Sequence, residues 1–105
     1  MTANMNMKFK GTDSEIHRAG GRLSDLLDSV PQDSWARNYA LQIAGDGGLA
    51  LGRLRSWDFV QLHVFSRALC ERLYALYRDR TDWPDGIHVL LETLIDVANL
   101  TEAVG

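Results

Sequence analysis

The amino-acid sequence predicts a mainly α-helical fold, a small bundle of about four helices that form a single domain. In several segments apolar residues recur every three or four positions, which places them on one face of a helix. Residues that cap helices precede these segments, and glycine or proline follows several of them. The chain of 105 residues is 46% hydrophobic and 24% charged, a composition typical of a soluble globular protein with one modest core.

The first predicted helix covers residues 12–30, and the segment TDSE marks its start. Thr12 can accept a hydrogen bond from the first turn while the Glu15 side chain accepts one from the Thr12 amide, an arrangement called a capping box. Asp13 adds negative charge where the helix dipole is positive. The apolar face behind this cap consists of Ile16, Ala19, Leu23, Leu26, Leu27 and Val30. Pro31 then ends the helix.

Residues 1–11 allow two interpretations. They form either a flexible arm or a short strand, because Met5, Met7 and Phe9 alternate with polar residues as in a strand with one buried face.

Residues 35–55 also allow two interpretations. In a helix, Trp35 and Tyr39 share one face, and Asp33 or Ser34 caps the first turn. In a β-hairpin, the same residues alternate with period two, GDGG forms the turn and LALGRLR returns. The propensities of Ala, Arg, Leu and Gln favour the helix.

The segment SWDFVQLHVFSRALCERLYALYRD, residues 56–79, predicts a long helix with apolar residues on two sides. Ser56 can cap this helix, and Asp58 lies in the first turn, where the dipole favours an acid. One broad sector is wide enough for the domain core. It consists of Leu62, Phe65, Leu69, Leu73, Leu76 and Tyr77, with Phe59 and Cys70 at its margin.

A second apolar sector lies elsewhere around this helix and has a charged border. Its apolar members are Trp57, Val60, Val64, Ala68 and Ala75, and Gln61, Arg67, Glu71 and Arg72 interrupt it. An apolar centre with a charged rim is typical of a protein interface, whereas a helix covered on all sides would show a similar pattern. Both interpretations stay open. The predicted partner-binding residues are Trp57, Val60, Val64, Arg67, Ala68, Glu71 and Arg72.

The last predicted helix follows the turn TDWPDG, with Thr81 or Asp82 as its cap, Pro84 in its first turn and its end near Glu102. Its apolar residues are Ile87, Leu90, Leu91, Leu94, Ile95, Ala98 and Leu100. The opposite side carries His88, Glu92, Asp96 and Asn99, an acidic face that we interpret as solvated. Metal sites in helical bundles need further ligands from facing helices, so we expect no metal here.

His63 and Cys70 are the one pair that suggests nucleophilic catalysis. Seven residues apart on one helix, they are separated by about 10 Å, too far for proton transfer. We therefore expect Cys70 to pack as a small hydrophobic residue and His63 to have one nitrogen satisfied. The sequence predicts neither an enzyme nor a cofactor or small-molecule substrate. A lone cysteine cannot form an intramolecular disulfide, which fits a reducing compartment.

The net charge of −3 argues against general nucleic-acid binding. The segment from Arg53 to Arg80, however, contains six arginines and three acidic residues. From Thr81 onward there are five acidic residues and no basic one. We expect these two segments to be antiparallel neighbours whose charges compensate at long range. A helix-turn-helix over residues 39–57 is the alternative, with Arg53 and Arg55 contacting phosphates.

These features predict a small protein that acts by binding another protein or itself as a homodimer. Inhibitors, immunity proteins and antitoxins carried by phages or plasmids are a class-level analogy. The alternative function is a DNA-binding regulator that uses the Arg53–Arg80 region. No segment has the continuous apolar stretch of a membrane span or secretory signal, so we expect a cytoplasmic location and no membrane partner.

Overall fold

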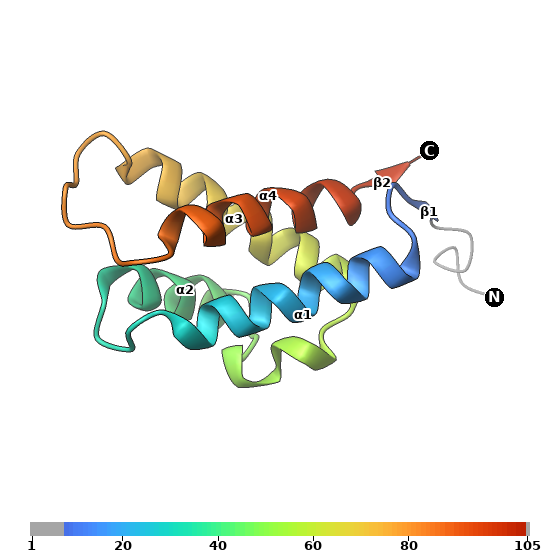
Figure 1. Ribbon diagram of the computed structural model, residues 1–105. Coiled ribbons are helices and arrows are strands. Elements are labelled where there is room, and N and C mark those ends of the chain that lie inside the picture. Colours follow the sequence, from blue (N-terminus) through green and yellow to red (C-terminus); the bar gives the residue numbers. More distant parts are fainter. Residues whose placement is uncertain (1–7, 105) are drawn as a thin grey trace.

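The computed structural model describes residues 8–104, and helices account for most of that range (Figure 1). The helices are α1 (Asp13–Ser29), α2 (Trp35–Asp46), the 3-10 helix η2 (Leu51–Ser56), α3 (Phe59–Leu76) and α4 (Ile87–Leu100). Two short strands, β1 (Lys8–Phe9) and β2 (Ala103–Val104), flank them. The predicted mainly α-helical bundle is confirmed.

Helix α4 packs against both α1 and α3, and α2 packs against α3 (Figure 1). The chain reverses direction between α3 and α4, so the predicted antiparallel neighbours are present. None of the ion pairs within residues 8–104 joins α3 to α4. Any compensation between the basic and the acidic segment therefore acts at long range rather than through direct ion pairs.

The start of α1 is the predicted capping box. The Thr12 amide donates to Glu15 Oε1 at 3.0 Å, and the Glu15 amide donates to Thr12 Oγ1 at 3.2 Å. The Thr12 hydroxyl also donates to Glu15 Oε1, at 3.0 Å. The bonds from the Thr12 amide and hydroxyl lower the pKa of the Glu15 carboxyl, because they stabilise its charged form.

The start of α3 differs from the prediction that Ser56 caps it. Asp58 is the cap and forms a second capping box with Gln61, whose amide donates to Asp58 Oδ1 at 2.8 Å. Ser56 instead ends η2, where its hydroxyl donates to the Arg53 carbonyl at 2.8 Å. Asp58, which was expected in the first turn, is thus the cap, and α3 begins two residues later than predicted. It also ends at Leu76 rather than near residue 79.

Residues 35–46 form an α-helix, so the favoured interpretation of this segment is confirmed and the hairpin is wrong. The Ser34 hydroxyl caps α2 by accepting from the Arg37 amide at 3.2 Å. The helix buries three alanines, Ala36, Ala40 and Ala44, which lets it lie close to its neighbours.

Helix α4 begins three residues after Pro84 and not at the predicted cap. Gly86 occupies the N-cap position of α4. Its φ is 79°, a left-handed conformation in which a residue with a side chain would be strained. Asp82, one of the two predicted caps, pairs with Arg80.

The two ends of the described chain meet in a short antiparallel pair, with Phe9 opposite Ala103. The Gly11 amide extends this contact by donating to the Leu100 carbonyl at 2.9 Å. The strand predicted near Phe9 therefore exists, although Met5 and Met7 of that prediction lie outside the described residues. Its partner at the other end of the chain was not predicted.

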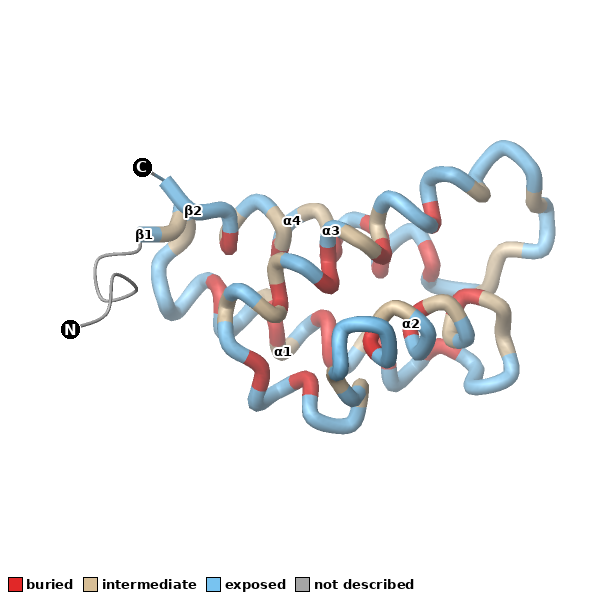
Figure 2. The backbone as a smooth tube through the Cα atoms, turned by 180° about the vertical axis from the view of Figure 1, so that it is seen from behind, coloured by how far each residue is buried: buried red, intermediate tan, exposed pale blue. Residues whose placement is uncertain are grey.

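The buried apolar residues form one cluster along the inward sides of the helices (Figure 2). From α3 it takes Leu62, Phe65, Leu69 and Leu73 of the predicted core sector, whereas Leu76 is half-buried and Tyr77 is exposed. Gly20 permits α1 to approach this sector, because a Cβ at that position would lie 3.3 Å from Leu62 Cδ1. Among the helices described, none is both long and apolar enough to cross a membrane.

Ser66 on the core side of α3 is fully buried, and its hydroxyl has no hydrogen-bond partner. Its desolvation is uncompensated, so we predict that Ser66→Ala raises the free energy of unfolding by about 1 kcal/mol in chemical denaturation. Thr93 is the matched control, because its buried hydroxyl donates to the Val89 carbonyl at 2.9 Å. Thr93→Ala should lower the stability. A loss of stability in Ser66→Ala would contradict the interpretation of an unsatisfied hydroxyl.

Candidate interaction surface

One side of α3 is left uncovered by the described residues. We call it the outer face of α3. Its members are exposed, except for the half-buried Ala68: Val60, Val64, Arg67, Ala68, Glu71, Tyr74 and Ala75. Val60 and Val64 are 50% and 57% exposed, and Tyr74 is 52% exposed. Most of the second apolar sector predicted from the sequence is therefore accessible, and the described chain does not surround α3 on all sides.

Trp57 does not belong to this surface, although it was predicted as an apolar anchor. It is only 8% exposed, and its ring packs edge-to-face on Phe65 with the centroids 5.1 Å apart. The physical reason is that Trp57 precedes α3 and has extended backbone angles, so helical spacing does not govern its direction. Trp57 is a core residue.

Two charged residues, Arg67 and Glu71, lie within the outer face, among its apolar members. Arg67 Nε lies 3.3 Å from Glu71 Oε1 one turn away, and both side chains are about 70% exposed (69% and 70%). Such an exposed pair contributes little to stability, so both groups keep capacity for other contacts. Arg72 turns toward α2 instead, and its guanidinium lies 5.4 Å from the centre of the Tyr39 ring.

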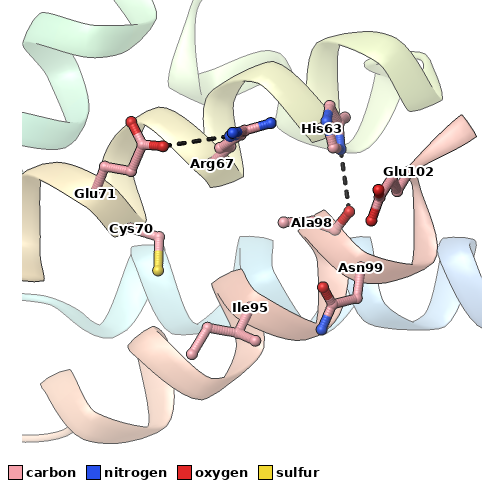
Figure 3. A pocket seen from close by; sticks show the side chains of 8 residues that line it. All are labelled: His63, Arg67, Cys70, Glu71, Ile95, Ala98, Asn99 and Glu102. Atoms are coloured by element: carbon pink, nitrogen blue, oxygen red, sulfur yellow. Dashed lines mark hydrogen bonds and ion pairs between the residues drawn. The ribbon is translucent and has the colours of Figure 1, made fainter.

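A groove of about 350 Å³ runs beside the outer face, between α3 and α4 (Figure 3). His63, Arg67, Cys70 and Glu71 line it from α3, and Ile95, Ala98, Asn99 and Glu102 line it from α4 and the residues after it. The groove thus shares Arg67 and Glu71 with the outer face, so the two form one continuous surface.

The chemistry of this groove does not resemble that of an activated nucleophile. Burial raises the pKa of the Cys70 thiol, and the neighbouring Glu71 carboxylate raises it further. His63 Nδ1 lies 3.1 Å from the Ala98 carbonyl oxygen and 3.2 Å from Thr101 Oγ1. One nitrogen of His63 is satisfied, as predicted, and the thiol stays protonated near neutral pH.

The predicted acidic face of α4 is exposed along its whole length. All four of its residues are solvent-accessible: His88, Glu92, Asp96 and Asn99. No group of three His, Cys, Asp or Glu side chains comes together within residues 8–104. At the start of the helix, the His88 ring stacks on Trp83 with the centroids 6.4 Å apart, which ties this end of the face to the preceding loop.

Sequence reasoning missed a cluster of aromatic and arginine side chains where the α3–α4 loop meets α2. Trp35 and Trp83 pack edge-to-face at 5.1 Å, and the Arg80 guanidinium lies 4.5 Å from the Trp35 ring centre. Trp35 Nε1 donates to the Asp82 carbonyl at 2.9 Å, and Trp83 Nε1 donates to the Arg80 carbonyl at 2.8 Å. Because its polar groups satisfy one another, the cluster fastens the loop to the bundle.

The segment after α2 does not form the second helix of a helix-turn-helix. It is the 3-10 helix η2, six residues long, which is too short to present a recognition helix to a groove. Arg53 is exposed, and Arg55 is paired with Asp25 of α1.

No family model, no curated protein and no solved structure matches this chain.

We predict different responses to truncation for the buried Trp57, which precedes α3, and the exposed Val64 on its outer face. We expect Trp57→Ala to lower the free energy of unfolding by about 3 kcal/mol, since it removes a buried ring. Val64→Ala should change it by less than about 0.5 kcal/mol, because the side chain is exposed. Urea denaturation of both variants measures the difference. Equal losses for the two variants would mean that Val64 is covered in solution or that Trp57 is not packed.

Proposed function

We propose that this protein acts by contact, as a small cytoplasmic module that binds another protein or itself through the outer face of α3. The observation that carries the proposal is the exposure of Val60 and Val64, at 50% and 57%, on successive turns of one helix. Full burial of one valine side chain contributes about 1.5 kcal/mol or more, so roughly half of that remains to be gained at each position.

A single exposed valine would need no explanation, because apolar atoms make up much of every protein surface. The support here is that Val60 and Val64 share one face of α3 with Tyr74 and Ala75, so the apolar surface extends along the helix. Arg67 and Glu71 lie on the same face. An apolar surface that includes an arginine and a tyrosine has the residue types enriched at protein interfaces.

The acidic face of α4 supports a second, electrostatic contribution. Glu92 and Asp96 are exposed, and the chain as a whole carries a net charge of −3. A basic partner would be attracted to this side of the molecule, and the attraction would speed its encounter and fix its orientation. This combination suits a regulator that occupies a surface of its target, as inhibitors, immunity proteins and antitoxins do.

Binding through the outer face of α3 is tested by a photo-crosslinking side chain at position 64. We expect irradiation of the native lysate to join this position to a protein, which mass spectrometry identifies as another chain or a second copy. The same side chain at position 89 is the control, because Val89 is an exposed valine on α4, away from the outer face of α3. Equal product patterns at both positions would contradict the proposal.

The same pair of valines provides a matched substitution test. Val64→Glu places a charge within the proposed contact and should weaken binding to the identified partner by at least about tenfold. Val89→Glu should leave the affinity unchanged, and circular dichroism should show both variants folded. An unfolded Val64→Glu would show that Val64 belongs to the core and would contradict the proposal.

A further inference from the structure

We propose that the occupant of the outer face of α3 is a second copy of this chain, with the two α3 helices antiparallel about a two-fold axis. This inference rests on the proposed function, because it names the partner of the same surface. It follows from the order in which apolar and charged residues succeed one another along α3.

The charges of the outer face are self-complementary. Arg67 and Glu71 lie one turn apart on the outer face. Leu69 lies midway between them along the helix axis, but its side chain is buried in the core. An antiparallel pair of helices centred at the level of Leu69 brings Arg67 opposite Glu71 of the second copy, and Glu71 opposite its Arg67. Four charges of alternating sign then meet near the two-fold axis. Each charge has two neighbours of the opposite sign, one in its own chain and one in the second copy.

The parallel pairing of the same surface lacks this match. Parallel helices in register would bring Arg67 against Arg67 and Glu71 against Glu71, and like charges across an interface are repulsive. Charge therefore favours the antiparallel arrangement over the parallel one.

Val64 and Tyr74 obey the same symmetry. In the antiparallel register, Val64 lies opposite Tyr74 of the second copy, since both are five residues from the level of Leu69. The two side chains are 57% and 52% exposed in the single chain, and each would cover the other. Ala68 and Ala75 are small enough to let the helices approach to about 8 to 10 Å.

The groove between α3 and α4 extends the contact beyond one pair of helices. An 18-residue helix is about 27 Å long, and a stable dimer commonly buries more surface than one such pair supplies. Since the groove adjoins Arg67 and Glu71, side chains of the second copy that flank its α3 can enter it.

Light scattering and charge reversal test this arrangement. The wild-type chain should approach twice its mass of 11.8 kDa as its concentration rises to about 1 mM. Arg67→Glu or Glu71→Arg alone makes all four charges alike, so each should weaken the dimer by at least about tenfold. The double variant restores alternation and should dimerise within about threefold of the wild type. Asp28→Arg is the control, because Asp28 is exposed on α1 and away from the outer face of α3, and it should leave the dimer intact.

The outcomes separate this inference from the proposed function. A wild-type chain that stays at 11.8 kDa overturns the dimer, while a crosslink from position 64 to a different protein would still support the proposed function. A dimer that survives both single reversals, or a double variant that stays monomeric, overturns the antiparallel pairing. Failure of position 64 to crosslink to any protein overturns both.

Discussion

The burial of one side of α3 is the interaction on which the rest of the structure depends. Phe65, Leu69 and Leu73 are almost fully covered, and α2 and α4 pack against this helix. A helix has room for neighbours on all sides, but here α4 also packs against α1 and α2 is short. The described chain therefore covers the core side of α3 and leaves its outer face, with Val60 and Val64, in contact with solvent.

Local signals in the sequence predicted much of this fold. The capping box at Thr12, the helix over residues 35–46 and the core side of α3 all follow from hydrogen-bonding chemistry and helical spacing. The start of α3 was wrong because Ser56 and Asp58 are both good caps, and the chain uses the second one with Gln61 as its partner. The pairing of β1 with β2 joins distant residues, which no local pattern encodes.

Local spacing also predicted part of the candidate surface. Spacing along the helix identified Val60, Val64, Arg67 and Glu71 as one face, because these residues obey the helical period. It misplaced Trp57, which lies before the helix and packs on Phe65. It also missed the cluster of Trp35, Trp83 and Arg80, whose members come from two segments far apart in the sequence and meet only after the bundle has formed. That cluster fixes the α3–α4 loop, and so the position of α4 beside the outer face.

The pairing of two outer faces is tested most directly by nuclear magnetic resonance on a mixture of isotope-labelled and unlabelled chains. A filtered nuclear Overhauser experiment detects only contacts between a labelled and an unlabelled copy. The antiparallel arrangement predicts a contact between the methyl groups of Val64 in one copy and the ring of Tyr74 in the other. Absence of this contact under conditions where the chain is dimeric, or intermolecular contacts confined to α1 or α2, would contradict the account.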